Sequence, residues 1–137
     1  LVQIMKFSDI NTSGLPNMMN VLAQKVASAG KTLFVLISPV IGILGSFISG
    51  SNAVSNLLFT NLQFETAANV GISQAVIVAA QIVGGAVGNI ICINNIVAAC
   101  ATVGISGKEG KIIRINIIPT IIYTVVVTAF FALLTLM

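Results

Sequence analysis

The residues of this chain that could bind a small ligand carry no charge and interrupt an apolar stretch. They are a glycine, two hydroxyl residues and two amides: Gly50, Ser51, Asn52, Ser55 and Asn56. On a helix that begins here, the two serines lie four residues apart, as do the two asparagines, so each pair shares a face. The free N–H groups at such a helix start can hold a carboxylate, and Ser51 or Asn52 is a suitable N-cap. We therefore expect a ligand-binding tip, with simple capping and helix packing as the alternative.

A second group of small and amide residues occurs in the uncharged stretch 66–107. Its members are Gln81, Gly84, Gly85, Gly88, Asn89, Asn94 and Asn95. Two of the glycines are four residues apart, a spacing that lets membrane helices approach closely, so packing alone can explain the glycines. Buried amides in a membrane need partners and usually face the interior of a helix bundle. We therefore predict that Gly85, Asn89 and Asn95 line the same binding site as the tip.

The charged side chains offer little material for catalysis. The sequence has three acids, six basic residues and no His, with no metal-ligand cluster and no phosphate-binding loop. Asp9 and Glu65 could relay protons if they were buried, but both lie near predicted element ends, where a solvated position is expected. We therefore expect no enzyme activity, no cofactor and no bound metal. The basic cluster Lys108, Lys111 and Arg114 directly precedes an apolar stretch, so it indicates membrane topology and not a nucleic-acid partner.

The elements that must position these residues are predicted to be membrane helices. The chain is 57% hydrophobic and 7% charged, whereas a typical soluble domain is about 25% charged. The stretches 32–64, 66–107 and 115–137 contain no charged residue. The first of them would be roughly 50 Å long as one helix, against about 30 Å for the core of a bilayer. We therefore predict an all-α, multi-span membrane protein in contact with the lipid bilayer, whose helices are interrupted.

The predicted elements follow the breaks in the apolar stretches. They are a helix at 15–30, a re-entrant helical hairpin at 32–65 with arms 32–49 and 52–65, a connector at 66–72, an interrupted transmembrane helix at 73–105, a cytoplasmic loop at 106–114 and a terminal span at 115–137. The second arm, about 21 Å long, is too short to cross, which favours a hairpin. The interrupted helix is expected to break at 84–89 or at 94–95. The basic residues place loop 106–114 in the cytoplasm, and secondary transporters use such breaks for substrate sites.

Four stretches of the chain carry a resemblance to a known family. They are NTSGLPNMM at 11–19, GILGSFISGSNAVSNLLFTNLQ at 42–63, AAQIVGGAVGNIICINNIVAACATVG at 79–104 and GKEG at 107–110. In their order and spacing they resemble the C-terminal portion of the L-lactate permease family, within a wider ion-transporter superfamily. The resemblance implies a C-terminal fragment of a secondary active transporter in the plasma (inner) membrane. Its substrate would be L-lactate or a related 2-hydroxycarboxylate, carried with proton coupling by alternating access.

The resemblance also implies how the site is completed. The substrate carboxylate would lie between the tip at 50–56 and the interrupted helix at 84–95, with a coupling proton or cation, and a matching hairpin from a missing N-terminal repeat would face it. The wider group often carries Ser-Asn-Thr at the tip. Here Ala53 lacks the Thr hydroxyl, and Ser55 is the residue that could compensate. The alternative function is a non-transporting accessory or structural membrane subunit.

Overall fold

The computed structural model describes residues 7–8, 10, 14, 16–28 and 30–136, and this part of the chain is helical. Its elements are α2 (Met18–Ala27), α3 (Lys31–Ser49), α4 (Asn52–Val70), α5 (Gln74–Gly88), the 3₁₀ turn η1 (Asn89–Ile91), α6 (Ile93–Thr102) and α7 (Glu109–Leu136). Three segments are long and apolar enough to cross a membrane: Lys31–Ser49, Gln74–Ile91 and Glu109–Thr135. The predicted all-α architecture with several apolar helices is confirmed. Asp9 lies outside the described residues, as do positions 15 and 29 of the predicted helix 15–30.

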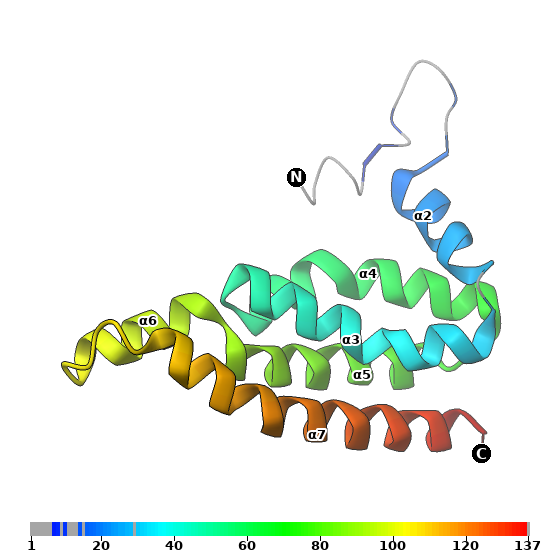
Figure 1. The fold of residues 1–137 in the computed structure, drawn as a ribbon. Coiled ribbons are helices and arrows are strands. Elements are labelled where there is room, and N and C mark those ends of the chain that lie inside the picture. Colours follow the sequence, from blue (N-terminus) through cyan, green and yellow to red (C-terminus); the bar gives the residue numbers. More distant parts are fainter. Residues whose placement is uncertain (1–6, 9, 11–13, 15, 29, 137) are drawn as a thin grey trace.

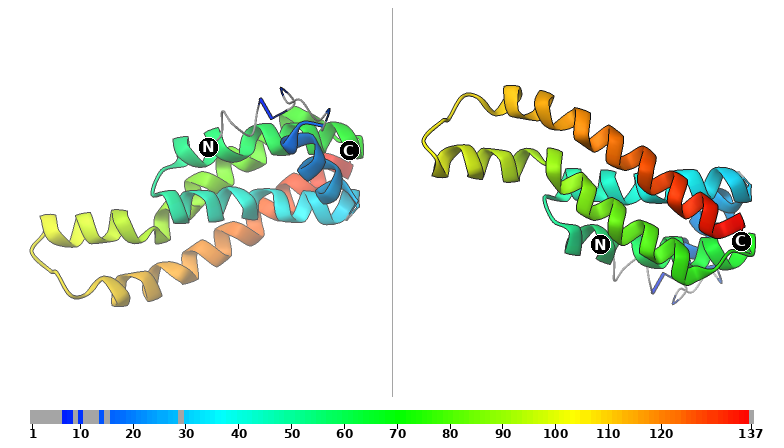
Figure 2. Two further views of the ribbon diagram at one scale, coloured as in Figure 1. Left: turned by 90° about the horizontal axis from the view of Figure 1, so that it is seen from above. Right: turned by 90° about the horizontal axis from the view of Figure 1, so that it is seen from below.

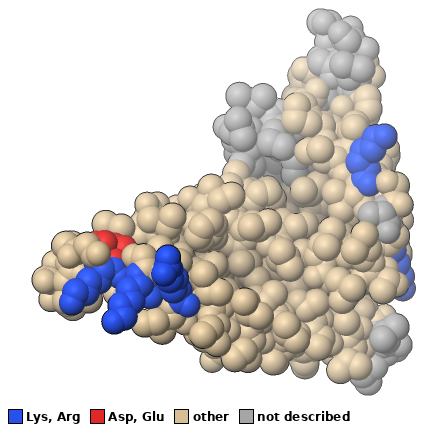
Figure 3. Space-filling view, in the orientation of Figure 1, with Lys and Arg blue, Asp and Glu red and all other residues tan. Residues whose placement is uncertain are grey.

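Helices α3, α4 and α5 form the body of the molecule, and α7 lies along α3 and α5 (Figure 1). Helix α2 packs against α4 at an angle to the other helices. Helix α6 and the first turns of α7 extend beyond the turn that joins α3 to α4, in both views of Figure 2. On the face shown in Figure 3, a cluster of basic side chains occupies this extended end. The long apolar helices therefore lie between two ends of the molecule, one of them strongly basic.

Glycines bring the backbones of α3 and α5 into direct contact. A Cβ atom built on Gly84 would lie 2.1 Å from the carbonyl oxygen of Pro39, and one built on Gly88 would lie 2.3 Å from that of Ile43. On the facing helix, a Cβ on Gly42 would lie 2.4 Å from the oxygen of Gln81. Real Cβ atoms do not approach so closely, so only glycine fits at these positions. This is the close approach that small residues at four-residue spacing permit between membrane helices.

Helices α3 and α4 form an antiparallel pair joined by a two-residue turn. Helix α3 ends at Gly50, which has the left-handed φ of 76° that glycine tolerates, and whose N–H donates to Ser46 O at 2.9 Å. Ser51 is extended and accepts a hydrogen bond from the N–H of Val54, so it is the N-cap of α4. At the far end, the ammonium of Lys31 lies 3.5 Å from Gly71 O. The chain therefore turns back at Gly50, and both outer ends of the pair are adjacent.

Helix α4 continues beyond the arm predicted at 52–65, through the segment expected as a connector, and ends at Val70. The reason is packing: Thr66 and Ala67 are buried, and Ala67 belongs to an apolar cluster that includes Phe34. Gly71, with a φ of 68°, then ends the helix. At 19 residues α4 is about 28 Å long. Its length therefore gives no argument for a re-entrant hairpin, unlike the shorter arm read from the sequence.

The stretch 73–105 is divided into α5, η1 and α6, and the non-α-helical residues 89–92 overlap the predicted breaks, 84–89 and 94–95, only at Asn89. Helix α5 ends at Gly88, η1 follows, and Cys92 is extended with φ −62° and ψ 125°. The segment 84–88 stays helical because its glycines pack against α3. At the break, the amide of Asn116 on α7 donates to the carbonyl of Ile90 at 3.0 Å, which satisfies one backbone group released there.

The last helix begins earlier than the terminal span predicted at 115–137. Helix α7 starts at Glu109, within the predicted loop 106–114, and Pro119 lies inside it. The Glu109 carboxylate accepts a hydrogen bond from the N–H of Gly107 at 2.9 Å, in the first turn of the helix. The basic residues Lys111 and Arg114 are consequently helical, and both are exposed.

Candidate functional site

The turn between α3 and α4 meets the break between α5 and α6. A Cβ atom built on Gly50 would lie 3.3 Å from the side-chain nitrogen of Asn94 and 3.4 Å from the sulfur of Cys92. The starts of α4 and α6 are therefore adjacent, as Figure 2 shows. Cys92 precedes α6 without a side-chain capping bond. Two helix N-termini, each with unpaired N–H groups and partial positive charge, thus converge on one polar region. We name this region the junction; it comprises residues 50–52 and 89–95.

Asn52 has an unusual environment within the junction. Its side-chain oxygen is buried and has no hydrogen-bond partner within the part of the chain that is described. It lies 2.0 Å from the position that a Cβ on Gly85 would occupy. Gly85 therefore makes room for the Asn52 amide. A buried polar atom without a partner costs about 1–3 kcal/mol, so its retention calls for an explanation beyond packing.

Two more of the predicted site residues lie together at the break. The Asn89 oxygen accepts a hydrogen bond from the Ser46 hydroxyl at 2.8 Å. The Asn95 amide nitrogen lies 3.5 Å from the same oxygen, and Asn95 is exposed. Asn89 is thus oriented by α3, whereas Asn95 stays available to a ligand. Asn94, which borders Gly50, is also exposed.

Ser55 and Asn56 face the interior of the body instead of the junction. Ser55 is fully buried, and its hydroxyl donates to Gly42 O at 3.0 Å and accepts from the Gln81 amide at 3.0 Å. The Asn56 oxygen accepts from the same Gln81 amide at 3.3 Å. The hydrogen-bonding groups of Ser55 are therefore occupied by protein. Its role in this structure is to position the first turns of α4.

A chain of buried amides and hydroxyls extends from Ser55 into the body. The Gln63 amide nitrogen donates to Gln81 Oε1 at 2.6 Å and to Ser38 O at 2.9 Å, and the Ser38 hydroxyl donates to Gln63 Oε1. Ser38, Gln63 and Gln81 are 0% exposed, which makes this an interior network joining α3, α4 and α5. Gln63 and Ser38 were not among the residues predicted from the sequence. The sequence spacing could have indicated Gln63, because it follows Ser55 by eight residues and so falls on the same face of α4.

The chemistry open to the junction is hydrogen bonding, through donors at the two helix starts and through the unpartnered acceptor oxygen of Asn52. Among the residues that the structure describes, no group of three or more His, Cys, Asp or Glu is placed to hold a metal ion. The two cysteines, Cys92 and Cys100, are buried and unpaired. Backbone N–H groups, amides and a hydroxyl remain. They suit a small anion whose charge is met by helix ends, without a basic side chain.

Apolar helices that are long enough to cross a bilayer, packed around an interior polar network, define a helical integral membrane protein. The sequence profile described as L-lactate permease matches residues 1–137. The chain therefore belongs to the L-lactate permease family, and the resemblance seen in the sequence is confirmed.

Relatives with known names support the same family. The chain is 45% identical over 113 residues to a Haemophilus influenzae protein named among the L-lactate permeases. The aligned region covers 82% of this chain and 21% of that protein. The chain is 44% identical over 107 residues to the L-lactate permease of Bacillus subtilis, covering 78% and 18%. It is 36% identical over 110 residues to the glycolate permease of Escherichia coli, covering 80% and 20%. No solved structure matches the chain significantly.

The relatives bear on function in two ways. They are named permeases, which are membrane transporters and not enzymes, and this favours the transporter over the accessory-subunit alternative. The chain spans about a fifth of the length of the curated relatives that it matches. The activity of the complete protein is therefore a proposal.

Proposed function

We propose that the complete protein carries L-lactate or a related 2-hydroxycarboxylate across the membrane, and that this chain supplies one side of the substrate site. The relatives named for lactate and for glycolate support this, because both compounds are small 2-hydroxycarboxylates. The main structural support is the meeting of two helix breaks, with Gly50 against Cys92 and Asn94. Such paired breaks are how secondary transporters present helix N-termini to anionic substrates.

In this proposal the carboxylate binds at the starts of α4 and α6. The N–H groups of both first turns and the exposed amides of Asn94 and Asn95 donate to its oxygens. Asn52 and Ser51 fix the shape of the tip. Asn89, held by Ser46, forms the adjoining wall. Helix dipoles meet the negative charge, which agrees with the lack of Lys and Arg from 32 to 107.

The position of the junction in the bilayer follows from α7. Asn116 contacts Ile90 at the break, so the junction is level with the start of the uncharged terminal segment. If the hydrocarbon core begins at Ile115, the helix from there to Leu136 is about 30 Å long and crosses it once. The α3–α4 pair would then be a re-entrant hairpin that enters from the outer side. Its tip would lie near the cytoplasmic boundary of the core, beside the basic residues of 108–114.

Alternating access and coupling to a proton or cation belong to the same proposal. A matching hairpin in the remainder of the protein would complete the site from the opposite side. Within the described residues the acids are Glu65 and Glu109, and Glu65, half-buried on α4, is the one on the hairpin. The candidates for the coupling group in this chain are therefore Glu65 and Asp9, which lies outside the described residues, and the remaining candidates lie in the rest of the transporter. The expected location is the plasma membrane.

The proposal is tested by substitution at the tip in the full-length transporter. Asn52→Ala or Ser51→Ala should reduce lactate uptake strongly, because the tip would lose the shape in which the N–H groups of α4 meet the carboxylate. One charge-assisted hydrogen bond lost in this way costs roughly 1.5–3 kcal/mol, about ten- to a hundredfold in affinity. Asn89→Ala should act similarly. Ser28→Ala is the control, since this hydroxyl is exposed and donates to Lys25 O in the preceding helix α2. Uptake is compared at equal surface expression. Unchanged apparent affinity and rate in a well-expressed Asn52→Ala variant would show that the break is structural.

A further inference from the structure

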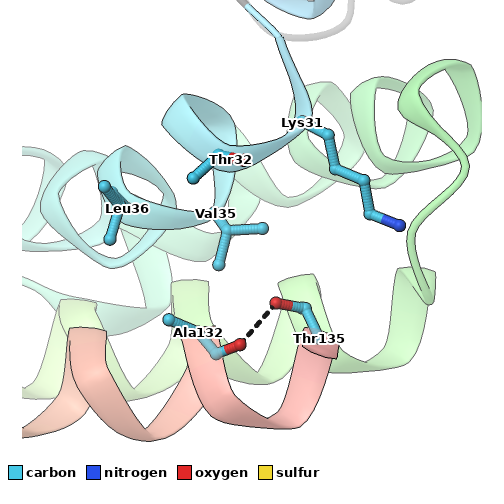
Figure 4. A pocket seen from close by; sticks show the side chains of 6 residues that line it. All are labelled: Lys31, Thr32, Val35, Leu36, Ala132 and Thr135. Atoms are coloured by element: carbon cyan, nitrogen blue, oxygen red, sulfur yellow. Dashed lines mark hydrogen bonds between the residues drawn. The ribbon is translucent and has the colours of Figure 1, made fainter. Parts of the chain in front are cut away.

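A groove of about 350 Å³ lies at the end of the molecule opposite the junction. It is formed by the start of α3 and the end of α7 and is lined by Lys31, Thr32, Val35, Leu36, Ala132 and Thr135 (Figure 4). Its volume falls at the lower end of the range of ligand pockets, about 300–1,000 Å³. The substrate proposed above does not account for it, because α3 separates this groove from the tip by the whole length of the helix.

The groove is amphipathic along its length. Lys31 and Thr32 belong to the first turn of α3 and Thr135 to the end of α7, and Val35, Leu36 and Ala132 line the remainder; the Lys31 side chain extends toward Gly71 O, away from Thr32 (Figure 4). The Thr135 hydroxyl bonds back to Ala132 O at 2.8 Å. A ligand that matches this pattern has a polar head and an apolar tail.

The head should be anionic. Lys31 is exposed, and its ammonium has Gly71 O at 3.5 Å as its nearest polar partner, with no acidic partner among the residues described. The N-cap of α3 is Gly30, which has no side chain to cap the first turn. The free N–H groups of that turn therefore add partial positive charge beside the Lys31 ammonium.

The location matches the boundary between lipid headgroups and acyl chains. Lys31 is the last charged residue before the uncharged stretch 32–64, and the apolar helix α7 ends beside it. Along its candidate span α7 is only 11% buried, so most of its surface is free to face lipid. A chain lying along Val35 and Leu36 would run toward the bilayer centre, with its headgroup level with Lys31.

We propose that this groove binds an anionic phospholipid, with its phosphate at Lys31 and Thr32 and one acyl chain along Val35, Leu36 and Ala132. Charge complementarity at Lys31 selects an anionic over a zwitterionic headgroup. The apolar lining of the groove contacts the acyl chain of the lipid. This proposal is independent of the substrate assignment, because the groove and the junction lie at opposite ends of α3.

The role of the Lys31 charge is tested with the full-length protein in mild detergent. Bound phosphatidylglycerol and phosphatidylcholine are measured by native mass spectrometry. Lys31→Gln should weaken phosphatidylglycerol binding about fivefold, which corresponds to roughly 1 kcal/mol for one basic residue near a headgroup, and leave phosphatidylcholine unchanged. Lys25→Gln is the matched control, since Lys25 is also exposed but does not line the groove. Equal phosphatidylglycerol affinity in Lys31→Gln and in the parent protein would overturn the proposal.

The shape of the groove is tested by a substitution that keeps the charge. Leu36→Trp should fill the apolar part and weaken binding of both lipids, whereas Leu33→Trp should not, because Leu33 is exposed on α3 outside the groove. If both tryptophan variants bind phosphatidylglycerol as the parent does, or if the parent binds neither lipid, another part of the transporter fills the groove and the proposal is wrong. Lactate uptake is not the readout, so failure here leaves the substrate proposal standing.

Discussion

At the junction, the orientation of the Asn52 side chain depends on a single residue, Gly85, which it contacts. The Asn52 oxygen is buried without a partner, and it fits only because the residue opposite has no side chain. The sequence indicated both residues as site candidates, from an amide at a helix break and a glycine in an apolar helix. It could not indicate that they touch, because they belong to different helices and their contact depends on the crossing of α4 and α5.

Gly85→Ala therefore tests the junction without altering any polar group. The added Cβ would lie 2.0 Å from the Asn52 oxygen, so the amide must turn away. We expect lactate uptake by the full-length protein to fall about tenfold or more, as with the loss of one charge-assisted hydrogen bond. Gly110→Ala is the control, because its Cβ would meet nothing within 4 Å. Normal uptake in Gly85→Ala would show that the Asn52 orientation does not matter for transport.

Helices α3, α4 and α5 are held together by two different kinds of contact. Glycines bring α3 and α5 to backbone contact, and the interior amides of Gln63 and Gln81 join all three helices. The glycine spacing was readable from the sequence, since Gly84 and Gly88 are four residues apart. The amide network was not, because a glutamine inside an apolar helix shows that partners are needed but not where they are.

The boundaries of the helices also depend partly on tertiary contacts that the sequence does not show. The turn at Gly50 was predicted to the residue, because a glycine followed by an N-cap serine is a strong local signal. The end of α4 was predicted too early. The segment 66–70 was predicted as part of a connector, whereas in the structure the packing of Ala67 with Phe34 and Val35 of α3 favours a further turn of helix. Local signals therefore predicted the turn at Gly50, whereas tertiary contacts set the helix lengths.

Gln63→Leu tests the network at the scale of the elements. The leucine removes the donor to Gln81 and Ser38 and leaves their buried oxygens without that partner. Each such loss costs about 1–3 kcal/mol, so the detergent-solubilised full-length protein should unfold at a clearly lower temperature. Asn61→Leu is the matched control on the same helix, because Asn61 is exposed. Equal unfolding temperatures for the two variants, as followed by thermal denaturation, would show that the network adds no stability.

At the scale of the whole molecule, basic residues lie at both ends of the long helices. Lys108, Lys111 and Arg114 lie at or just before the start of α7, at the end where Figure 3 shows a cluster of basic side chains on one face, and Lys31 lies at the other end. Both ends of the α3–α4 pair are on the Lys31 side. If the basic cluster is cytoplasmic, the pair enters from the outer side, and a substrate released at the junction has a short path to the cytoplasm.

The orientation itself can be measured by thiol labelling in intact cells. Cysteines are placed one at a time at Gly110, beside the basic cluster, and at Asn69, an exposed position near the end of α4. Because Lys and Arg in short loops set topology, an impermeant reagent should label Asn69→Cys in intact cells and Gly110→Cys only after permeabilisation. Cys92 and Cys100 are buried and should contribute little background. Strong labelling of Gly110→Cys in intact cells, with none at Asn69→Cys, would reverse the orientation and place the junction near the outer surface.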